Sequence, residues 1–466
     1  MRRIMIKKLL FLVILISVIG CANTKIKTIQ NTSSKDVKII KPNLKSDKAL
    51  KRDIVTFYKS WKEQYLKIVP NKNPEQIYLD YGVEARKDPD ALSDWFDPAN
   101  AVTTSESQGY AMIITASMAN IDKNNINNYK EQFNALYRFF RAHPSRFSND
   151  LMCWQEVGIG LEKKGDTVTG EVTDVKNIEE GADSAIDGDM DIAYSLLIAD
   201  KIWGSNGEIN YKEEALKVIK AIMKNEVNKK EHILLLGDWV LNSIKNGEIK
   251  ENKKYLTITR SSDFILDHLR AFSNIDKENS KEWTNILEKT EAIINYNVNK
   301  WSKNTGLVAD FLQKDENGNY TPAIGNVLEG DNDGDYNWNA CRDPWRFSVD
   351  VIYNKSQKIT SSIKILNNWV KKNSMEDPEK IYPGYYIRNG EVGKVIDDRN
   401  TWGEDLSFTA PFLVSGCVGE NNQEWINKLW ENIIDTKIGD SEYFGNAIKM
   451  QALIIASGNL VNVIGE

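Results

Sequence analysis

Glu106 offers the simplest acid–base chemistry in this sequence. It follows Thr104 and Ser105, both good N-cap residues, and it precedes an apolar run with helical spacing. A carboxylate in the first turn of a helix often does no more than stabilise the helix dipole. Glu106 therefore becomes a catalytic candidate only in combination with other carboxylates.

A second group of carboxylates occupies alternate positions where another helical pattern begins: Asp187, Asp189 and Asp191. One of them can act as an N-cap, and a calcium loop is another ordinary explanation. An EF-hand loop starting at Asp187 would need glycine and glutamate where this sequence has Ile192 and Ile198. The cluster is therefore predicted to accept hydrogen bonds from sugar hydroxyl groups rather than to bind a metal ion.

A third segment, residues 329–346, combines acids, aromatic rings and two arginines beside a helix start marked by Pro344. An EF-hand fails here too, because its glycine and glutamate positions, counted from Asp331, are not filled by those residues. A solvated acidic loop is the plain alternative, although the adjoining aromatic residues make it less satisfactory. The candidate functional residues of this segment are Glu329, Tyr336, Trp338, Asn339 and Arg342.

The composition narrows the class of ligand. The net charge is −6 and no strongly basic block follows the N-terminus, so a nucleic-acid partner is not indicated. Only three histidines are present, and the cysteine spacing fits no zinc site, so neither a metal nor a cofactor is predicted. Thirteen tryptophans exceed the ordinary needs of a core, and indole faces stack well on sugar rings.

The N-terminus has the layout of a secretory signal peptide. Basic residues precede an apolar run, 9–20, that is too short to span a bilayer comfortably. The run ends in Val-Ile-Gly-Cys, which resembles a bacterial lipobox and implies cleavage before Cys21 and lipid attachment to its thiol. Residues 22–47 are polar without an apolar period and are predicted to form a flexible tether. A lipid-anchored protein on the outer face of the cell membrane is therefore expected.

Apolar residues with helical spacing recur twelve times in the predicted catalytic domain, residues 48–466. No long alternating strand pattern separates them, and no fixed-period repeat indicates a solenoid. An all-α fold of about twelve helices, six inner and six outer, closed into a toroid, is predicted. The patterns centre on 54–65, 110–117, 133–140, 192–203, 215–222, 264–269, 283–294, 345–352, 363–370, 406–413, 425–433 and 444–455.

Together the three segments resemble the blocks of family 8 glycoside hydrolases, in the same order. These blocks are Ser-Glu-x-x-Gly-Tyr at 105–110, Asp-Gly-Asp-x-Asp-Ile-Ala at 187–193 and Asn-Ala-Cys-Arg-x-Pro-Trp-Arg at 339–346. One small departure is Ile186, where the family usually has Thr or Ser. The resemblance implies an (α/α)6 barrel and an inverting mechanism. It also implies that Glu106 is the general acid and that Asp187 holds the sugar at the cleavage subsite.

Asn339 is a more informative departure. The cellulase and xylanase branch has an Asp general base at this position, and an asparagine cannot take a proton from water. Another branch, which includes chitosanases and β-1,3-1,4-glucanases, has Asn here and takes its base from a Glu in a preceding loop insertion. Glu329 precedes Asn339 by ten residues in an acidic loop, so the resemblance makes it the candidate base.

Three functional hypotheses follow. The first is an inverting endo-hydrolase that cuts β-1,4 bonds of chitosan, since a carboxylate-rich cleft attracts a cationic polymer. The second keeps the chemistry but takes a β-1,3-1,4-glucan or cellulose as substrate. The third is a lipoprotein that only binds polysaccharide. Trp239, in Leu-Gly-Asp-Trp, resembles a stacking tryptophan of the chitosanase branch, although it is equally compatible with a core position.

Overall fold

The computed structural model describes residues 37–87, 99–165, 167–178, 182–245, 247–388 and 390–464. The predicted signal peptide, Cys21 and the first part of the predicted tether lie outside these residues. Within the described ranges, no helix is long and apolar enough to cross a membrane.

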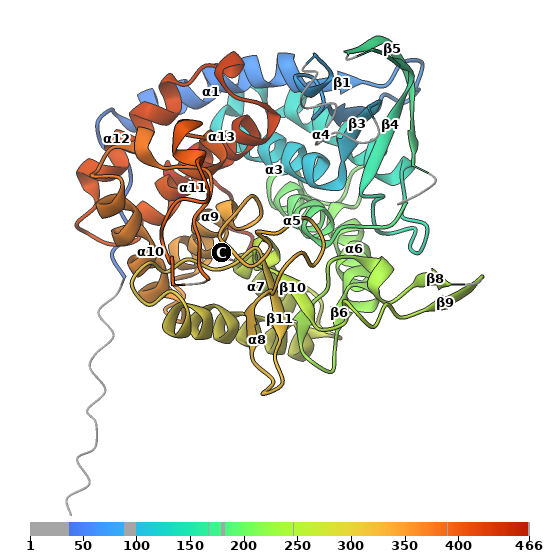
Figure 1. Cartoon of the computed structure of the whole chain (residues 1–466). Coiled ribbons are helices and arrows are strands. Elements are labelled where there is room, and N and C mark those ends of the chain that lie inside the picture. Colours follow the sequence, from blue (N-terminus) through green and yellow to red (C-terminus); the bar gives the residue numbers. More distant parts are fainter. Residues whose placement is uncertain are drawn as a thin grey trace, which may run out of the picture. The chain divides into compact units, whose positions relative to one another are not determined.

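Twelve α-helices form the framework of the described chain, and each coincides with one of the twelve predicted helical patterns (Figure 1). The agreement follows from their regular apolar spacing. The helices are α1 (Asp47–Tyr65), α3 (Ser105–Ile121), α4 (Ile126–Ala142), α5 (Ile186–Trp203), α6 (Tyr211–Asn225), α7 (Leu266–Ile275), α8 (Ser280–Lys300), α9 (Asp343–Asn354), α10 (Thr360–Asn373), α11 (Leu406–Gly416), α12 (Gln423–Asp435) and α13 (Tyr443–Ala456).

The helices are arranged in two concentric layers. The inner helices contact one another in a closed ring, in the order α3, α5, α7, α9, α11, α13 and back to α3. Outside them, α4, α6, α8, α10, α12 and α1 pack on α3, α5, α7, α9, α11 and α13 respectively. The structure is therefore the (α/α)6 barrel that the sequence predicted.

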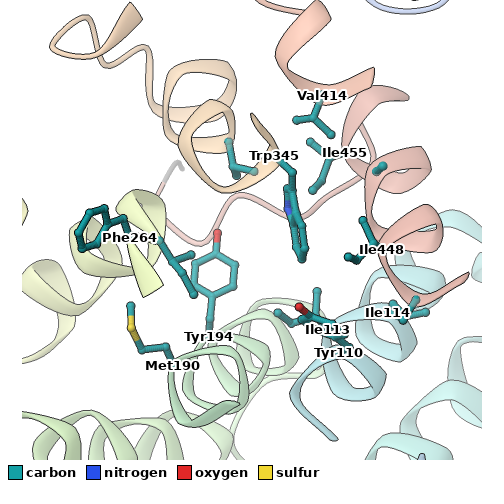
Figure 2. Packing of buried hydrophobic residues seen from close by; sticks show 14 of the residues in the cluster. Tyr110, Ile113, Ile114, Met190, Tyr194, Phe264, Trp345, Val414, Ile448 and Ile455 are labelled. Atoms are coloured by element: carbon teal, nitrogen blue, oxygen red, sulfur yellow. The ribbon is translucent and has the colours of Figure 1, made fainter. Parts of the chain in front are cut away.

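Burial distinguishes the two layers. Every residue of the inner helix α11 is buried, and α3 is buried except at Glu106 and Asn120. The outer helices bury one stripe each, as expected for helices that have one face in solvent. At the centre, Trp345 of α9 points toward Tyr110 of α3, with 5.8 Å between their ring centroids (Figure 2).

Two glycines let α3 and α5 approach unusually closely. A Cβ atom on Gly188 would lie 2.4 Å from the carbonyl carbon of Ser105, and one on Gly109 would lie 2.7 Å from the Cβ atom of Asp191. No side chain can be accommodated at these distances without moving a helix. This close contact brings together the first turns of α3 and α5, where Glu106 and Asp187 lie.

The short strands are all antiparallel, and one hairpin is long. β4 (Gln155–Lys164) pairs with β5 (Thr167–Asn177) and with β3 (Ala101–Thr104), which leads directly into α3. The sequence did not predict this hairpin, because a register shift between Ile159 and Leu161 and a mostly exposed outer half interrupt the apolar alternation that marks a long strand. The other strands are β1 (Leu66–Ile68), β2 (Ile77–Leu79), β6 (Val227–Asn228), β7 (Ile233–Leu234), β8 (Ser243–Lys245), β9 (Glu248–Lys250), β10 (Ile258–Arg260), β11 (Phe311–Lys314) and β12 (Tyr320–Pro322).

Residues 37–46 correct the predicted boundary of the tether. Ile39 forms a bridge with Val418, and the amide of Ile40 donates to the carbonyl of Cys417 at 3.0 Å. Asn43 exchanges two hydrogen bonds with Asn427, each 2.9 Å long. This segment therefore belongs to the folded domain, because its backbone pairs with the chain that follows α11.

Candidate active site

The first turns of the inner helices converge at one mouth of the barrel and present the predicted acid. Thr104 is the N-cap of α3 and accepts a hydrogen bond from the amide of Ser107, so Glu106 occupies the second helical position. Asp187 occupies the same position in α5. Arg342, which caps α9, contacts both carboxylates through Nη1.

Glu106 is held in a nearly enclosed position that favours its protonated form. The Tyr110 hydroxyl donates to its Oε1 atom at 2.8 Å, and the side chain keeps only 21% of its surface exposed. Burial raises the pKa of the Glu106 carboxyl, the charge of Arg342 opposes this shift, and the negative charge of Asp187 adds to it. A carboxyl group with a raised pKa suits proton donation near neutral pH.

Asp187 is kept ionised. Burial opposes its charge, but Arg260 and Arg342, whose guanidinium nitrogens lie 3.1 and 3.2 Å from Oδ2, outweigh it and hold the pKa of Asp187 below its usual value. The pKa values of the neighbouring Glu106 and Asp187 carboxyls are thus shifted in opposite directions. Such a separation of pKa values is typical of an acid–base site.

Asn339 joins the predicted base to the rest of the site. Its Nδ2 atom donates to Oε2 of Glu329 at 2.7 Å, and its Oδ1 atom accepts from Nη2 of Arg342 at 2.8 Å. Because arginine can only donate, this contact fixes the orientation of the amide and leaves its NH2 group facing Glu329. Glu329 itself keeps 45% of its side chain exposed, which leaves it access to water.

Asp310 and Arg260 complete the site and were not among the predicted residues. Buried Asp310 accepts from the backbone amides of Asn337, Asn339 and Ala340 at 2.7–3.1 Å, and also from the Asn339 side chain. Burial raises the pKa of Asp310 to about 7, with the charge of nearby Glu329 contributing. Neither residue lies in a block that resembles the family, so no sequence signal marked them.

The acidic loop before Asn339 is mostly structural. Asp333 accepts hydrogen bonds from the backbone amides of residues 327–330, between 2.8 and 3.2 Å, and so shapes the turn that carries Glu329. Asp335 forms an ion pair with Arg388, and Asp343 is fully buried. These carboxylates do not face a polymer, which removes most of the charge that was expected to attract a cationic substrate.

Three predicted substrate-binding residues lie behind the reacting groups instead. Tyr336 is fully buried between Tyr385 and Phe408, so its assignment as a sugar contact was wrong. Arg342 and Asn339 are only 3% and 5% exposed. Their side chains hydrogen-bond to the candidate reacting groups, Glu329, Glu106 and Asp187, so they position these groups rather than line the binding surface.

The alternate carboxylates of α5 also separate by role. Asp191 is fully buried, forms a two-pronged ion pair with Arg346 at 2.6 and 2.9 Å, and accepts from His268. Asp189 accepts from the amide of Met152 at 2.8 Å. Only Asp187 faces the catalytic group, so the prediction of a three-carboxylate sugar site was wrong for the other two.

A cavity of about 560 Å³ opens beside the site, within the size range of ligand pockets. Trp338, which directly precedes Asn339, forms one wall, and the first turns of α11 and α13 form the others. The full lining is Trp338, Glu404, Asp405, Leu406, Ser407, Thr436, Asp440, Ser441, Glu442, Phe444 and Gly445.

Trp239 lies in a different sector of the mouth. Its partly exposed ring packs edge-on against Tyr255, at a centroid distance of 4.8 Å. The Tyr255 hydroxyl donates to the carbonyl of Val327, two residues before Glu329. The predicted tryptophan is therefore near the loop that carries the base.

The described residues include no group of three or more His, Cys, Asp or Glu side chains able to hold a metal ion. Cys153, Cys341 and Cys417 are buried and free. The mouth brings together one enclosed carboxyl, Glu106, one exposed carboxylate, Glu329, and two arginines, Arg260 and Arg342.

Comparisons with known proteins agree on one family. A model described as glycosyl hydrolases family 8 matches residues 96–457. A beta-glucanase of Niallia circulans is 34% identical over 421 residues, covering 90% of this chain and 88% of that protein. An endoglucanase of Bacillus sp. (strain KSM-330) is 32% identical over 423 residues, covering 90% of this chain and 79% of that protein.

Solved structures agree with this result. The apo beta-1,3-1,4-glucanase of Paenibacillus sp. X4 superposes with a TM-score of 0.74 at 33% identity, covering 91% of this chain and 95% of that chain. Rex8A from Paenibacillus barcinonensis, complexed with xylose, has a TM-score of 0.64 at 14% identity, covers 90% of this chain and 94% of that chain, and supports the fold alone. The protein therefore belongs to glycosyl hydrolases family 8, and it is a glycoside hydrolase.

Proposed function

We propose that this protein is an inverting endo-hydrolase of β-1,4 bonds in β-glucans, including mixed-linkage β-1,3-1,4-glucan. The observation that carries the proposal is the 2.7 Å hydrogen bond from Asn339 to Glu329. This hydrogen bond places the Glu329 carboxylate beside position 339. The cellulase and xylanase branch of the family has an Asp general base at that position, whereas this chain has Asn339, which cannot accept a proton. The names of relatives that are at least 32% identical, a beta-glucanase and an endoglucanase, favour a glucan substrate.

The mechanism assigns one step to each carboxyl group. Burial and the charge of Asp187 raise the pKa of Glu106 and so favour its protonated form. Glu106 donates its proton to the glycosidic oxygen as the bond breaks. Glu329 accepts a proton from a water molecule, which attacks the anomeric carbon from the opposite face of the sugar. Inversion requires the two groups to stand about 6.5–9.5 Å apart, so that this water fits between Glu329 and the sugar.

The order of the inner helices supports an endo mode. Glu106 begins α3 and Glu329 precedes α9, and these two helices lie three places apart in the ring of six. Trp239 precedes α7, whereas the cavity lies at α11 and α13, so these two regions occupy the remaining opposite sectors. A polymer that runs from Trp239 to the cavity passes between acid and base and can extend beyond both ends.

Chitosan is the second candidate substrate, because the resemblance places Asn339 in a branch that includes chitosanases. The electrostatic argument for it is weaker than the sequence suggested. Asp333, Asp335 and Asp343 are buried, and Arg260 and Arg342 offset the charge of Asp187. The glucan hypothesis does not depend on electrostatic attraction between a carboxylate-rich cleft and a cationic polymer.

Product analysis on lichenan, carboxymethyl cellulose and chitosan, performed side by side, tests the substrate. We expect fast release of short oligosaccharides from a glucan, with the α-anomer formed first in proton NMR spectra. Predominant cleavage of chitosan that slows as salt rises would replace the glucan assignment with the chitosanase one. Initial formation of the β-anomer would contradict inversion.

We also propose that Cys21 carries a lipid that anchors the enzyme to the outer face of the membrane. The support is the Val-Ile-Gly-Cys sequence after a short apolar run. Replacing Cys21 with serine should move the protein from the membrane fraction to the soluble fraction with unchanged specific activity. Retention in the membrane fraction would contradict the anchor, and it would leave the catalytic proposal unaffected.

A further inference from the structure

Trp402 is one of the most exposed large apolar side chains among the described residues, with 58% of its surface accessible. It follows the short 3-10 turn Arg399–Thr401, and two residues later the chain enters the wall of the 560 Å³ cavity at Glu404 and Asp405. Single exposed aromatic residues need no explanation in general. This one is informative because the chain reaches the cavity lining only two residues after it.

Arg399 holds the indole in place beside the site. Its guanidinium carbon lies 5.3 Å from the centre of the Trp402 ring, a cation–π contact. The same guanidinium donates to Oδ1 of Asn337 at 2.5 Å and to the carbonyl of Pro383 at 2.8 Å. Asn337 immediately precedes Trp338, so the exposed ring and the cavity wall are linked through one buried arginine.

The cavity also connects to the catalytic acid. The ring of Phe444, part of the lining, lies 5.7 Å from the guanidinium carbon of Arg342, which contacts Glu106. The cavity lining therefore lies near the acid at Phe444. At Glu404 and Asp405 the lining belongs to the segment of the chain that directly follows Trp402.

We propose that Trp402 is a stacking platform for a glucose ring beyond the cavity, and that it forms an outer subsite for long β-glucan chains. This inference rests on the proposed glucanase function and extends it to substrate length. Indole binds the apolar face of a sugar ring with little loss of conformational freedom, and its contact with Arg399 reduces that loss further. Only chains long enough to cross the whole cavity reach Trp402, so its contribution depends on substrate length.

The test compares kcat/KM of wild-type enzyme, Trp402→Ala and Trp402→Phe on cello-oligosaccharides of increasing length and on lichenan. We expect Trp402→Ala to lose roughly tenfold on lichenan and on the longest oligosaccharides, mainly through KM, and to match wild type on the shortest cleaved oligosaccharide. Trp402→Phe should recover most of the loss because it keeps an aromatic face. Trp301→Ala, which removes another exposed indole at the end of α8, should behave as wild type on all substrates.

Two outcomes would overturn the inference. Equal losses on short and long substrates would show that the substitution disturbs the site as a whole, and unchanged kinetics on lichenan would show that no sugar binds Trp402. Wild-type activity on the same glucans tests the proposed function separately. If the wild-type enzyme is active and the effect of Trp402→Ala does not depend on substrate length, only the outer subsite is disproved. If the wild-type enzyme is inactive on all of these glucans, the proposed glucanase function is disproved together with the outer subsite.

Discussion

Two carboxylates two residues apart on α5 experience opposite environments. Asp187 lies between Arg260 and Arg342, and its pKa is lowered although it is buried. Asp189, equally buried, is hydrogen-bonded to Glu226, and burial raises the pKa of both groups well above their usual values. The partners of the Asp189 group are otherwise neutral: Ser184 donates to Glu226 at 2.5 Å, and the amide of Met152 donates to Asp189.

This difference shows that burial alone does not make a carboxyl group catalytic. The Asp189–Glu226 pair, in which burial favours the protonated forms, links α5 to the end of α6, which is a structural role. At the mouth, burial raises the pKa of Glu106 and the charge of Asp187 adds to this shift, whereas Arg260 and Arg342 lower the pKa of Asp187 despite its burial. Experiments can distinguish the two groups. Substitutions at the mouth should lower the catalytic rate, whereas substitutions in the Asp189–Glu226 pair should change the stability of the fold.

The largest effect is expected at the acid. Glu106→Gln keeps the shape of the side chain but cannot donate a proton, so kcat on lichenan should fall by roughly 10³- to 10⁴-fold. Binding of the polysaccharide, measured by affinity electrophoresis, should be preserved. A variant that keeps most of the wild-type rate would reduce Glu106 to a residue that stabilises the first turn of α3.

Glu329→Gln should cost roughly 10²- to 10³-fold in kcat, because no group would then activate the attacking water. Glu329→Gly leaves space for a small anion, and added azide should partly restore turnover with a glycosyl azide as product. Asp331→Asn, in the same loop but exposed, is the matched control and should retain nearly full activity. Loss in the control without loss in the Glu329 variants would assign the base to Asp331.

The pair Asp187→Asn and Asp189→Asn tests the comparison most directly. We expect roughly 10- to 100-fold lower kcat for Asp187→Asn, since two arginines lose their partner and Glu106 loses the charge that raises its pKa. Asp189→Asn should change kcat less than about threefold, because a protonated carboxyl and an amide are similar in shape and both can donate. Comparable losses in both variants would abolish the distinction between the two groups.

The smallest effect concerns the pH dependence of stability. The folded-state pKa values of Asp189 and Glu226 lie above their unfolded values, so their contribution is complete at low pH and is lost as the pH rises through the folded values. Above the unfolded pKa of a Glu side chain, about 4.3, Glu226→Gln should make the fall of the unfolding free energy with pH less steep by about 1.4 kcal/mol per pH unit, for one proton fewer. Urea unfolding at a series of pH values upward from this point measures this slope. An unchanged slope would mean that Glu226 is already ionised in the folded protein.

The sequence predicted the barrel more successfully than the surroundings of the candidate acid and base. Helical spacing located the twelve helices of the described residues, and one departure from the family pattern, Asn339, led to Glu329, which the structure places within a hydrogen bond of it. Tyr336 was misassigned because adjacency in sequence to a site does not determine which way a ring points. Asp310 escaped prediction because its role consists of accepting backbone amides from a segment 27–30 residues away.

The docking of residues 37–46 has a consequence for how the enzyme faces its surroundings. This segment joins the barrel beside Cys417 and Val418, at the carboxyl end of α11, whereas the catalytic mouth lies at the amino end of the same helix. If Cys21 is lipidated, the fifteen residues 22–36 allow a standoff of at most about 50 Å between bilayer and barrel. Such an anchor would join the barrel at the end opposite the mouth, and this would leave the mouth accessible to polymers too large to reach the membrane.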